Sequence, residues 1–83
     1  MKMGAELRKE HEELCKKFSV RLRAIREKEY GPRRAWAMAE ALGISSANYS
    51  VMERGKFLPS MPVLLRICKV LGCTPNELLE GMY

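Results

Sequence analysis

Few residues of this sequence could do covalent or metal chemistry. The chain has one histidine, His11, and three cysteines, Cys15, Cys68 and Cys73. Three cysteines form no even disulfide set, and the Cys68-x4-Cys73 spacing has no second cysteine pair that would complete a metal site. We therefore interpret the cysteines as small apolar residues in a reducing cytoplasm, and we expect neither a metal nor a cofactor.

The carboxylates offer no catalytic arrangement either. Glu40, Glu53 and His11 form no constellation with a nucleophile, and no glycine-rich phosphate loop is present, so we expect no enzyme. No apolar run approaches the roughly 20 residues that span a bilayer, and charged residues follow the N-terminus in place of a signal peptide. The 83 residues therefore predict one small, soluble protein without a membrane partner.

The positive charges are the residues most able to bind a partner. Of the net charge of +5, residues 1–18 contribute +1 and residues 57–83 are neutral. Residues 19–56 hold eight Lys or Arg and four Glu, so most of the excess lies there. A polyanion would dock on this part of the chain, although solvated surface charge would look the same.

That basic stretch contains the pattern of two short helices joined by a tight turn. The apolar segment from Trp36 to Leu42 ends at Gly43, which can close a helix in the left-handed conformation. Ser45 can then cap the next helix, predicted at about 46–53. Two helices joined in this way form a helix-turn-helix unit, whose second helix can enter the major groove of DNA.

The outward face of the predicted helix 46–53 is unusual. Tyr49 and Met52 are three residues apart and should face inward, which leaves small uncharged side chains outside. Such side chains allow close approach to base edges, and the following Arg54-Gly55-Lys56 turn supplies cations for the phosphate backbone.

The flanking segments also predict helices. Residues 6–29 contain no proline or glycine and predict one helix, with a kink near Ser19 as the alternative. Arg33 and Arg34 are expected to open the second helix after Pro32, with Met38, Ala39 and Leu42 on its core face. Trp36 could pack under the loop or cap the core, and we do not assign it to DNA. Ser60 is expected to cap a fourth helix that ends at Gly72, and Thr74-Pro75-Asn76-Glu77 is a capping box for a short fifth helix.

From about Val20 to Gly81 the chain resembles the Cro and phage-repressor (XRE-type) helix-turn-helix family. The matching segments are Arg21–Arg26, Met38-Ala39-x3-Gly43-Ile44-Ser45, Glu53-Arg54-Gly55-Lys56 and Leu58-Pro59-Ser60 through to Gly81. The resemblance implies an all-α, compact five-helix domain like that of lambda repressor. It further implies a transcriptional regulator, repressor-like, that binds palindromic operator DNA as a homodimer.

The resemblance also implies roles for individual residues, which we combine with the outward face of residues 46–53. Base contacts are expected from Ser46, Ala47, Ser50 and Val51. Phosphate contacts are expected from Arg33, Arg34, Ala35, Ser45, Asn48, Arg54 and Lys56. Arg26 and Glu53 match a pair that often joins helices one and three in the family by a salt bridge.

Two features depart from the family pattern. The connection 30–35 is about two residues longer, and the recognition positions lack the Gln, Arg or Lys side chains that read purine edges. Discrimination is therefore expected to depend more on DNA shape. Residues 1–18 lie outside the resemblance as an N-terminal helical extension to the domain 19–83. They could serve self-association, or could capture a protein partner if the chain is instead an antitoxin or adaptor.

Overall fold

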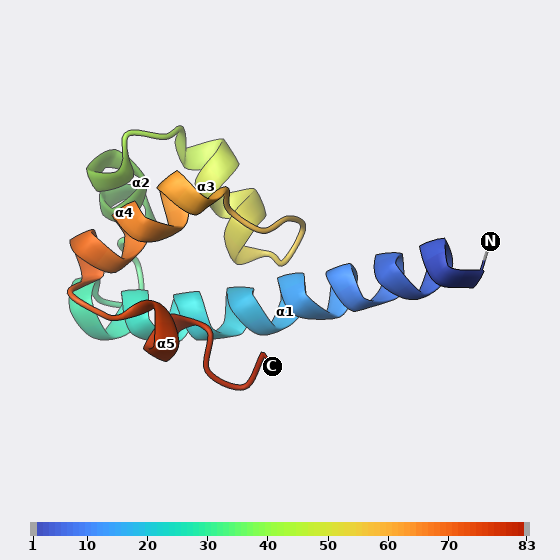
Figure 1. The fold of residues 1–83 in the computed structure, drawn as a ribbon. Coiled ribbons are helices and arrows are strands. Elements are labelled where there is room, and N and C mark those ends of the chain that lie inside the picture. Colours follow the sequence, from blue (N-terminus) through green and yellow to red (C-terminus); the bar gives the residue numbers. More distant parts are fainter. Residues whose placement is uncertain (1, 83) are drawn as a thin grey trace.

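The computed structural model describes residues 2–82, and the side chains of residues 6–82, so residues 1 and 83 at the outer ends of the two expected domains lie outside it. Five helices and no strand are found in this part of the chain, which confirms the predicted all-α class. They are α1 (Lys2–Tyr30), α2 (Ala35–Leu42), α3 (Ser46–Glu53), α4 (Met61–Leu71) and α5 (Pro75–Leu78). Figure 1 shows the four shorter helices gathered on the C-terminal part of α1, while its N-terminal turns project beyond them.

Helix α1 is longer than the sequence predicted and runs without interruption past residue 18. Ser19, the residue at which a kink was considered, is buried, and its hydroxyl donates a hydrogen bond of 2.7 Å to the Lys16 carbonyl. A serine that bonds back to its own helix in this way is accommodated without a break. The expected boundary between residues 18 and 19 is therefore not marked by any change of the backbone.

The core lies where the short helices meet the C-terminal half of α1. Burial of apolar side chains there is the main contribution that favours folding of a domain of this size. The buried cluster contains Phe18, Leu22, Met38, Ala39, Leu42, Tyr49, Met52, Ile67, Cys68, Leu71 and Leu78. In α1 the buried positions begin at Cys15, whereas residues 6–13 are all exposed. The long helix therefore has a packed half and a solvated half.

The turn between α2 and α3 is built as the sequence predicted. Gly43 has a φ of 73° and closes α2, and its N–H group donates to the Glu40 carbonyl over 3.1 Å. Ser45 precedes α3 in extended conformation, and its hydroxyl accepts a 3.0 Å hydrogen bond from the Asn48 N–H group. The glycine stop and serine start thus fix the angle at which α3 leaves α2.

The start of α2 was predicted wrongly. Pro32, Arg33 and Arg34 do not form its first turn; α2 begins at Ala35. Gly31 ends α1 with a φ of 94°, and the chain needs the next three residues to reverse direction before Arg34 accepts the first α2 hydrogen bonds on its carbonyl. Trp36 does not pack near the core either, because it faces outward with 58% of its surface exposed.

The last two helices have the predicted bounds, with small differences at their caps. Ser60 occupies the N-cap position of α4, but its side chain makes no capping hydrogen bond. Gly72 ends α4 with a φ of 67°. The Thr74 hydroxyl accepts a 3.2 Å hydrogen bond from the Glu77 N–H group, which is the first half of a capping box. None of the described helices is both long and apolar enough to span a bilayer.

Gly55 is the glycine on which the packing of α3 against α1 depends. Its φ is 76°, and a Cβ atom at this position would lie 3.1 Å from Ser19 Oγ and 3.3 Å from the Lys16 Cα atom. Gly72 has a similar φ of 67° but open space around it. The same substitution at the two glycines therefore separates backbone strain from the close approach of two elements.

We expect Gly72→Ala to lower the free energy of unfolding by about 1 kcal/mol, the cost of a left-handed alanine. Gly55→Ala should cost at least about 1 kcal/mol more, because α1 backbone must also shift. Urea unfolding followed by circular dichroism measures both. Equal losses would show that α3 and α1 do not depend on this contact.

Candidate nucleic-acid interface

The outer face of α3 carries small uncharged side chains. Ser46, Ala47, Asn48 and Ser50 are exposed, and Val51 is half-buried. On the opposite face Tyr49, Met52 and Glu53 are buried. The eight-residue helix thus turns its bulky and charged groups inward. Its solvent side has no long side chain to hold it away from another surface.

Cations lie at two places along the motif. Arg54 and Lys56 are exposed in the turn that follows α3, and Arg33 and Arg34 are exposed in the connection before α2. None of the four takes part in the ion pairs found between described residues. Their charges are therefore available to an external anion.

The N-terminus of α2 lies with the second pair of arginines. Ala35, half-buried, is its first residue, and no side chain caps this end within the described part of the chain. The unpaired N–H groups of a first helical turn favour a negative charge. The exposed Ser45 hydroxyl accepts one hydrogen bond and still has its own proton to donate.

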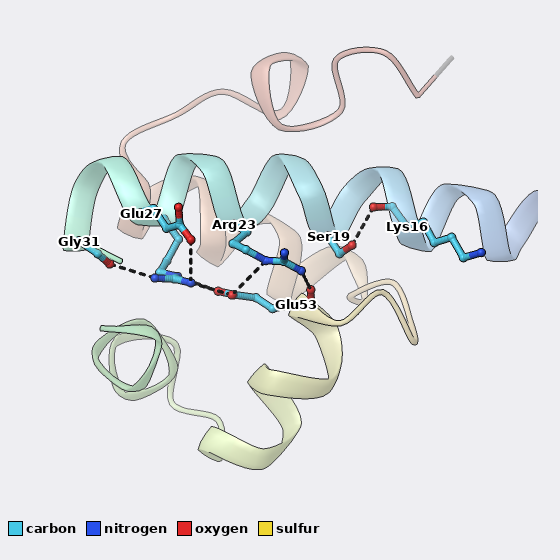
Figure 2. Close-up of polar contacts among 7 residues, drawn as sticks. Lys16, Ser19, Arg23, Glu27, Gly31 and Glu53 are labelled. Carbon is cyan, nitrogen blue, oxygen red and sulfur yellow. Dashed lines mark hydrogen bonds and ion pairs between the residues drawn. The ribbon is translucent and has the colours of Figure 1, made fainter. Parts of the chain in front are cut away.

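Glu53, at the end of α3, is held by a two-point ion pair with Arg26 of α1. Arg26 Nε donates to Glu53 Oε2 and Arg26 Nη2 to Glu53 Oε1, each over 2.8 Å. Arg26 Nη1 also donates to the Gly31 carbonyl over 3.0 Å. Figure 2 shows this network, in which Glu53 points from the end of α3 toward α1. Both side chains are buried, so the pair fixes α3 in rotation as well as in position.

The electrostatics of the pair favour its charged form. Burial alone would raise the pKa of the Glu53 carboxyl, but the hydrogen bonds and positive charge of Arg26 outweigh burial and hold that pKa below its ordinary value. The hydrogen bond to Glu53 likewise raises the pKa of the Arg26 guanidinium. The pair therefore stays ionised throughout the neutral range.

Two further arginines, which the sequence analysis did not single out, support the motif. Arg23 Nη2 donates to the Glu53 carbonyl over 2.6 Å at the C-terminal end of α3, where a cation complements the helix dipole. Arg66 Nη1 donates to the Leu42 carbonyl over 3.1 Å at the end of α2. The position of Arg23, one turn before Arg26, could have pointed to the first contact. Nothing local in the sequence indicates the second.

Tyr49 lies beneath the outer face of α3 with its side chain fully buried. Its hydroxyl makes no hydrogen bond within the described residues. Burial raises the pKa of this phenol, with the nearby Glu53 carboxylate adding to the effect. Tyr49 therefore acts as an uncharged, bulky support between α3 and the core.

Loss of the Glu53 charge should destabilise the domain in a pH-dependent way. We expect Glu53→Gln to lower the free energy of unfolding at neutral pH by about 3 kcal/mol, because Arg26 is left buried without its counter-ion. The pKa of the Glu53 carboxyl is lower in the folded protein than in the unfolded chain. The stability that the wild type has over Glu53→Gln is therefore present above pH 4.5, and it is lost as the pH falls through the pKa of the folded protein.

Urea unfolding at neutral pH and at about pH 3 measures this advantage. Glu40→Gln on the exposed side of α2 is the matched control, expected within about 0.5 kcal/mol of the wild type. A Glu53→Gln difference that is the same at both pH values would contradict the predicted coupling.

Comparison with known proteins identifies the motif. The model of a family described as a helix-turn-helix domain matches residues 17–80, which include helices α2 to α5 and α1 from residue 17 onward. No curated protein and no solved structure matches the chain. With more than half of its length matched, the chain belongs to the helix-turn-helix domain family.

Proposed function

We propose that this protein is a sequence-specific regulator of transcription that binds double-stranded DNA as a dimer on a palindromic operator. The observation that carries the proposal is the small, uncharged outer face of α3, with unpaired arginines and a lysine on either side of it. Helix α3 would lie in the major groove, as the second helix of this motif does.

The proposed base contacts come from Ser46, Ala47, Ser50 and Val51. Serine hydroxyls both donate and accept hydrogen bonds, and Ala47 and Val51 can make apolar contact with a thymine methyl group. No side chain among the four makes two hydrogen bonds to one purine. Specificity would therefore depend in part on how easily the operator takes the shape that the protein requires.

The proposed phosphate contacts surround this helix. Arg54 and Lys56 would contact the backbone at the end of α3, with Ser45 and Asn48 at its start. Arg33, Arg34 and the N–H group of Ala35 would contact a phosphate at the start of α2. The helix N-terminus and the guanidinium groups there would act on one anion.

A dimer would double the number of base pairs that this short face reads. Two copies related by a two-fold axis match an inverted repeat whose half-sites are about one helical turn of DNA apart.

The three cysteines are free, which is consistent with a protein that acts in a reducing cytoplasm.

The cations of the α3–α4 turn supply a direct test. We expect Arg54→Ala and Lys56→Ala each to weaken binding to all duplexes, because each removes a phosphate contact without removing base readout. The slope of log affinity against log salt should fall by about one for each lost contact. Fluorescence anisotropy with a duplex of mixed sequence at several salt concentrations measures both effects.

Lys28→Ala is the matched control, because Lys28 is also exposed but lies on α1 beside Gly72 and Glu77, near the other end of the fold. It should change neither the affinity nor the slope beyond the general effect of one charge. If Arg54→Ala and Lys56→Ala change the slope of log affinity against log salt no more than Lys28→Ala does, this turn does not contact DNA.

A further inference from the structure

The N-terminal half of α1 lies outside the fold that carries the proposed DNA interface. Residues 6–13 are all exposed, and the molecule measures 42 Å along its long axis but only 25 and 23 Å across. Figure 1 shows these turns extending past every other helix. So few helical turns are marginal in water on their own, and packing against another surface would stabilise them.

The charges of α1 are divided between its two halves. Residues 6–13 hold four glutamates and two basic residues, whereas residues 16–24 hold four basic residues and no acidic one. The projecting half is therefore net negative and the packed half net positive, with Arg21 and Arg23 already paired to Glu80 and Glu53 and Lys16 and Lys17 outside the ion pairs found between described residues. Glu6, Glu10, Glu13 and Lys17 take part in none of the ion pairs found between described residues.

These charges lie in one row on the side of α1 that faces solvent. Residues 6, 10, 13, 17, 20 and 24 are separated by alternating steps of four and three, the spacing of a seam between two paired helices. All six side chains are exposed, and Val20 keeps 64% of its surface in contact with water. At its C-terminal end the row forms the floor of a surface groove, where Val20 and Ala24 lie beside Lys16, Lys17 and Arg21. Glu80 and Gly81 of the C-terminal segment form another side of this groove, and Met82 lies beside Glu13 and Lys17, so a partner helix has to lie alongside this segment.

We propose that a second copy of this chain pairs with α1 along this row in antiparallel orientation. The inference rests on the proposed function, in which two copies bind one operator, and it names the surface that joins them. Glu13 of each copy would lie opposite Lys17 of the other. The glutamates nearer the N-terminus would lie along the groove formed by Val20 and Ala24 with its flanking lysines.

Charge decides the orientation and the kind of partner. In a parallel pair Glu10 and Glu13 would face their own copies, and like charges at a helix seam repel. The antiparallel pair places the negative half of each helix on the positive half of the other, and a two-fold axis satisfies both halves at once. The row is thus complementary to itself only when the second helix is reversed.

The strength expected of this interface is modest. Exposed ion pairs contribute little each and are screened by salt, so the dimer should be weak in free solution and weaker still at high ionic strength. Two adjacent half-sites on DNA would hold both copies at high effective concentration and so reinforce it.

Charge reversals within the row test the pairing. Glu13→Lys alone places two lysines opposite each other at both symmetric positions, and Lys17→Glu alone does the same with two glutamates. Each single variant should weaken dimerisation at least about tenfold, and the double variant Glu13→Lys/Lys17→Glu should restore it because both pairs are re-formed in reverse. An equal mixture of the two single variants should form a heterodimer, since opposite charges then meet at both positions.

Sedimentation equilibrium of the full chain without DNA, at low and high salt, measures these dimerisation constants. Glu12→Lys is the matched control, because it makes the same charge change on the same exposed turns but outside the row. Circular dichroism of every variant checks that α1 keeps its helix content.

Four results would overturn the inference: a monomer at all concentrations, a dimer insensitive to both single reversals, a double variant that stays weak, or Glu12→Lys weakening the dimer equally. Binding to a mixed-sequence duplex separates this inference from the proposed function. If DNA binding is normal and the pairing is absent, only the dimer surface is wrong. If folded wild-type protein binds no duplex, the proposed function itself is wrong.

Discussion

The position of α3 depends on the buried pair between Arg26 and Glu53. A helix of eight residues is not stable alone, and its outer face contributes nothing to the core because its side chains are small and exposed. Its orientation must therefore be fixed from beneath and from its ends. The arginine fork holds the last residue of α3, Tyr49 and Met52 fill the space below it, and Ser45 caps its start. Each of these contacts leaves the outward face unoccupied.

The value of this ion pair lies more in defining one geometry than in adding stability beyond what apolar packing would give. Removing two charges from water is unfavourable, and well-packed apolar residues at the same positions are often as stable as a buried ion pair. An apolar contact would not set the rotation of α3 as tightly, however, because it lacks the two parallel hydrogen bonds of the fork. Arg23 strengthens the same contact between α1 and α3 by donating a hydrogen bond to the Glu53 carbonyl. Arg23 and Arg26 thus position α3 from inside, whereas Arg54 and Lys56 beyond its end stay exposed and outside the ion pairs found between described residues.

Local rules account for the parts of the fold that could be predicted from the sequence. Gly43 and Ser45 specify the turn by their own backbone and hydrogen-bonding properties, so the bounds of α3 and the residues on its outer face followed directly. The start of α2 was missed because the length of the reversal after Gly31 depends on where α1 and α2 pack. Trp36 was misplaced for a related reason, since a large aromatic residue in a short helix gives no sign of which side the core leaves open. The contact of Arg66 with Leu42 joins residues far apart in the chain, and no periodicity indicates it.

The central claim is that α3 reads base sequence, and selection from a random duplex library tests it most directly. The folded wild-type protein would be mixed with the library at physiological salt, and the bound pool sequenced after repeated rounds. The account predicts enrichment of an inverted repeat with half-sites about one helical turn apart. A folded protein that binds duplexes yet enriches no sequence would contradict the claim, because the outer face of α3 would then make no contact that distinguishes one base pair from another.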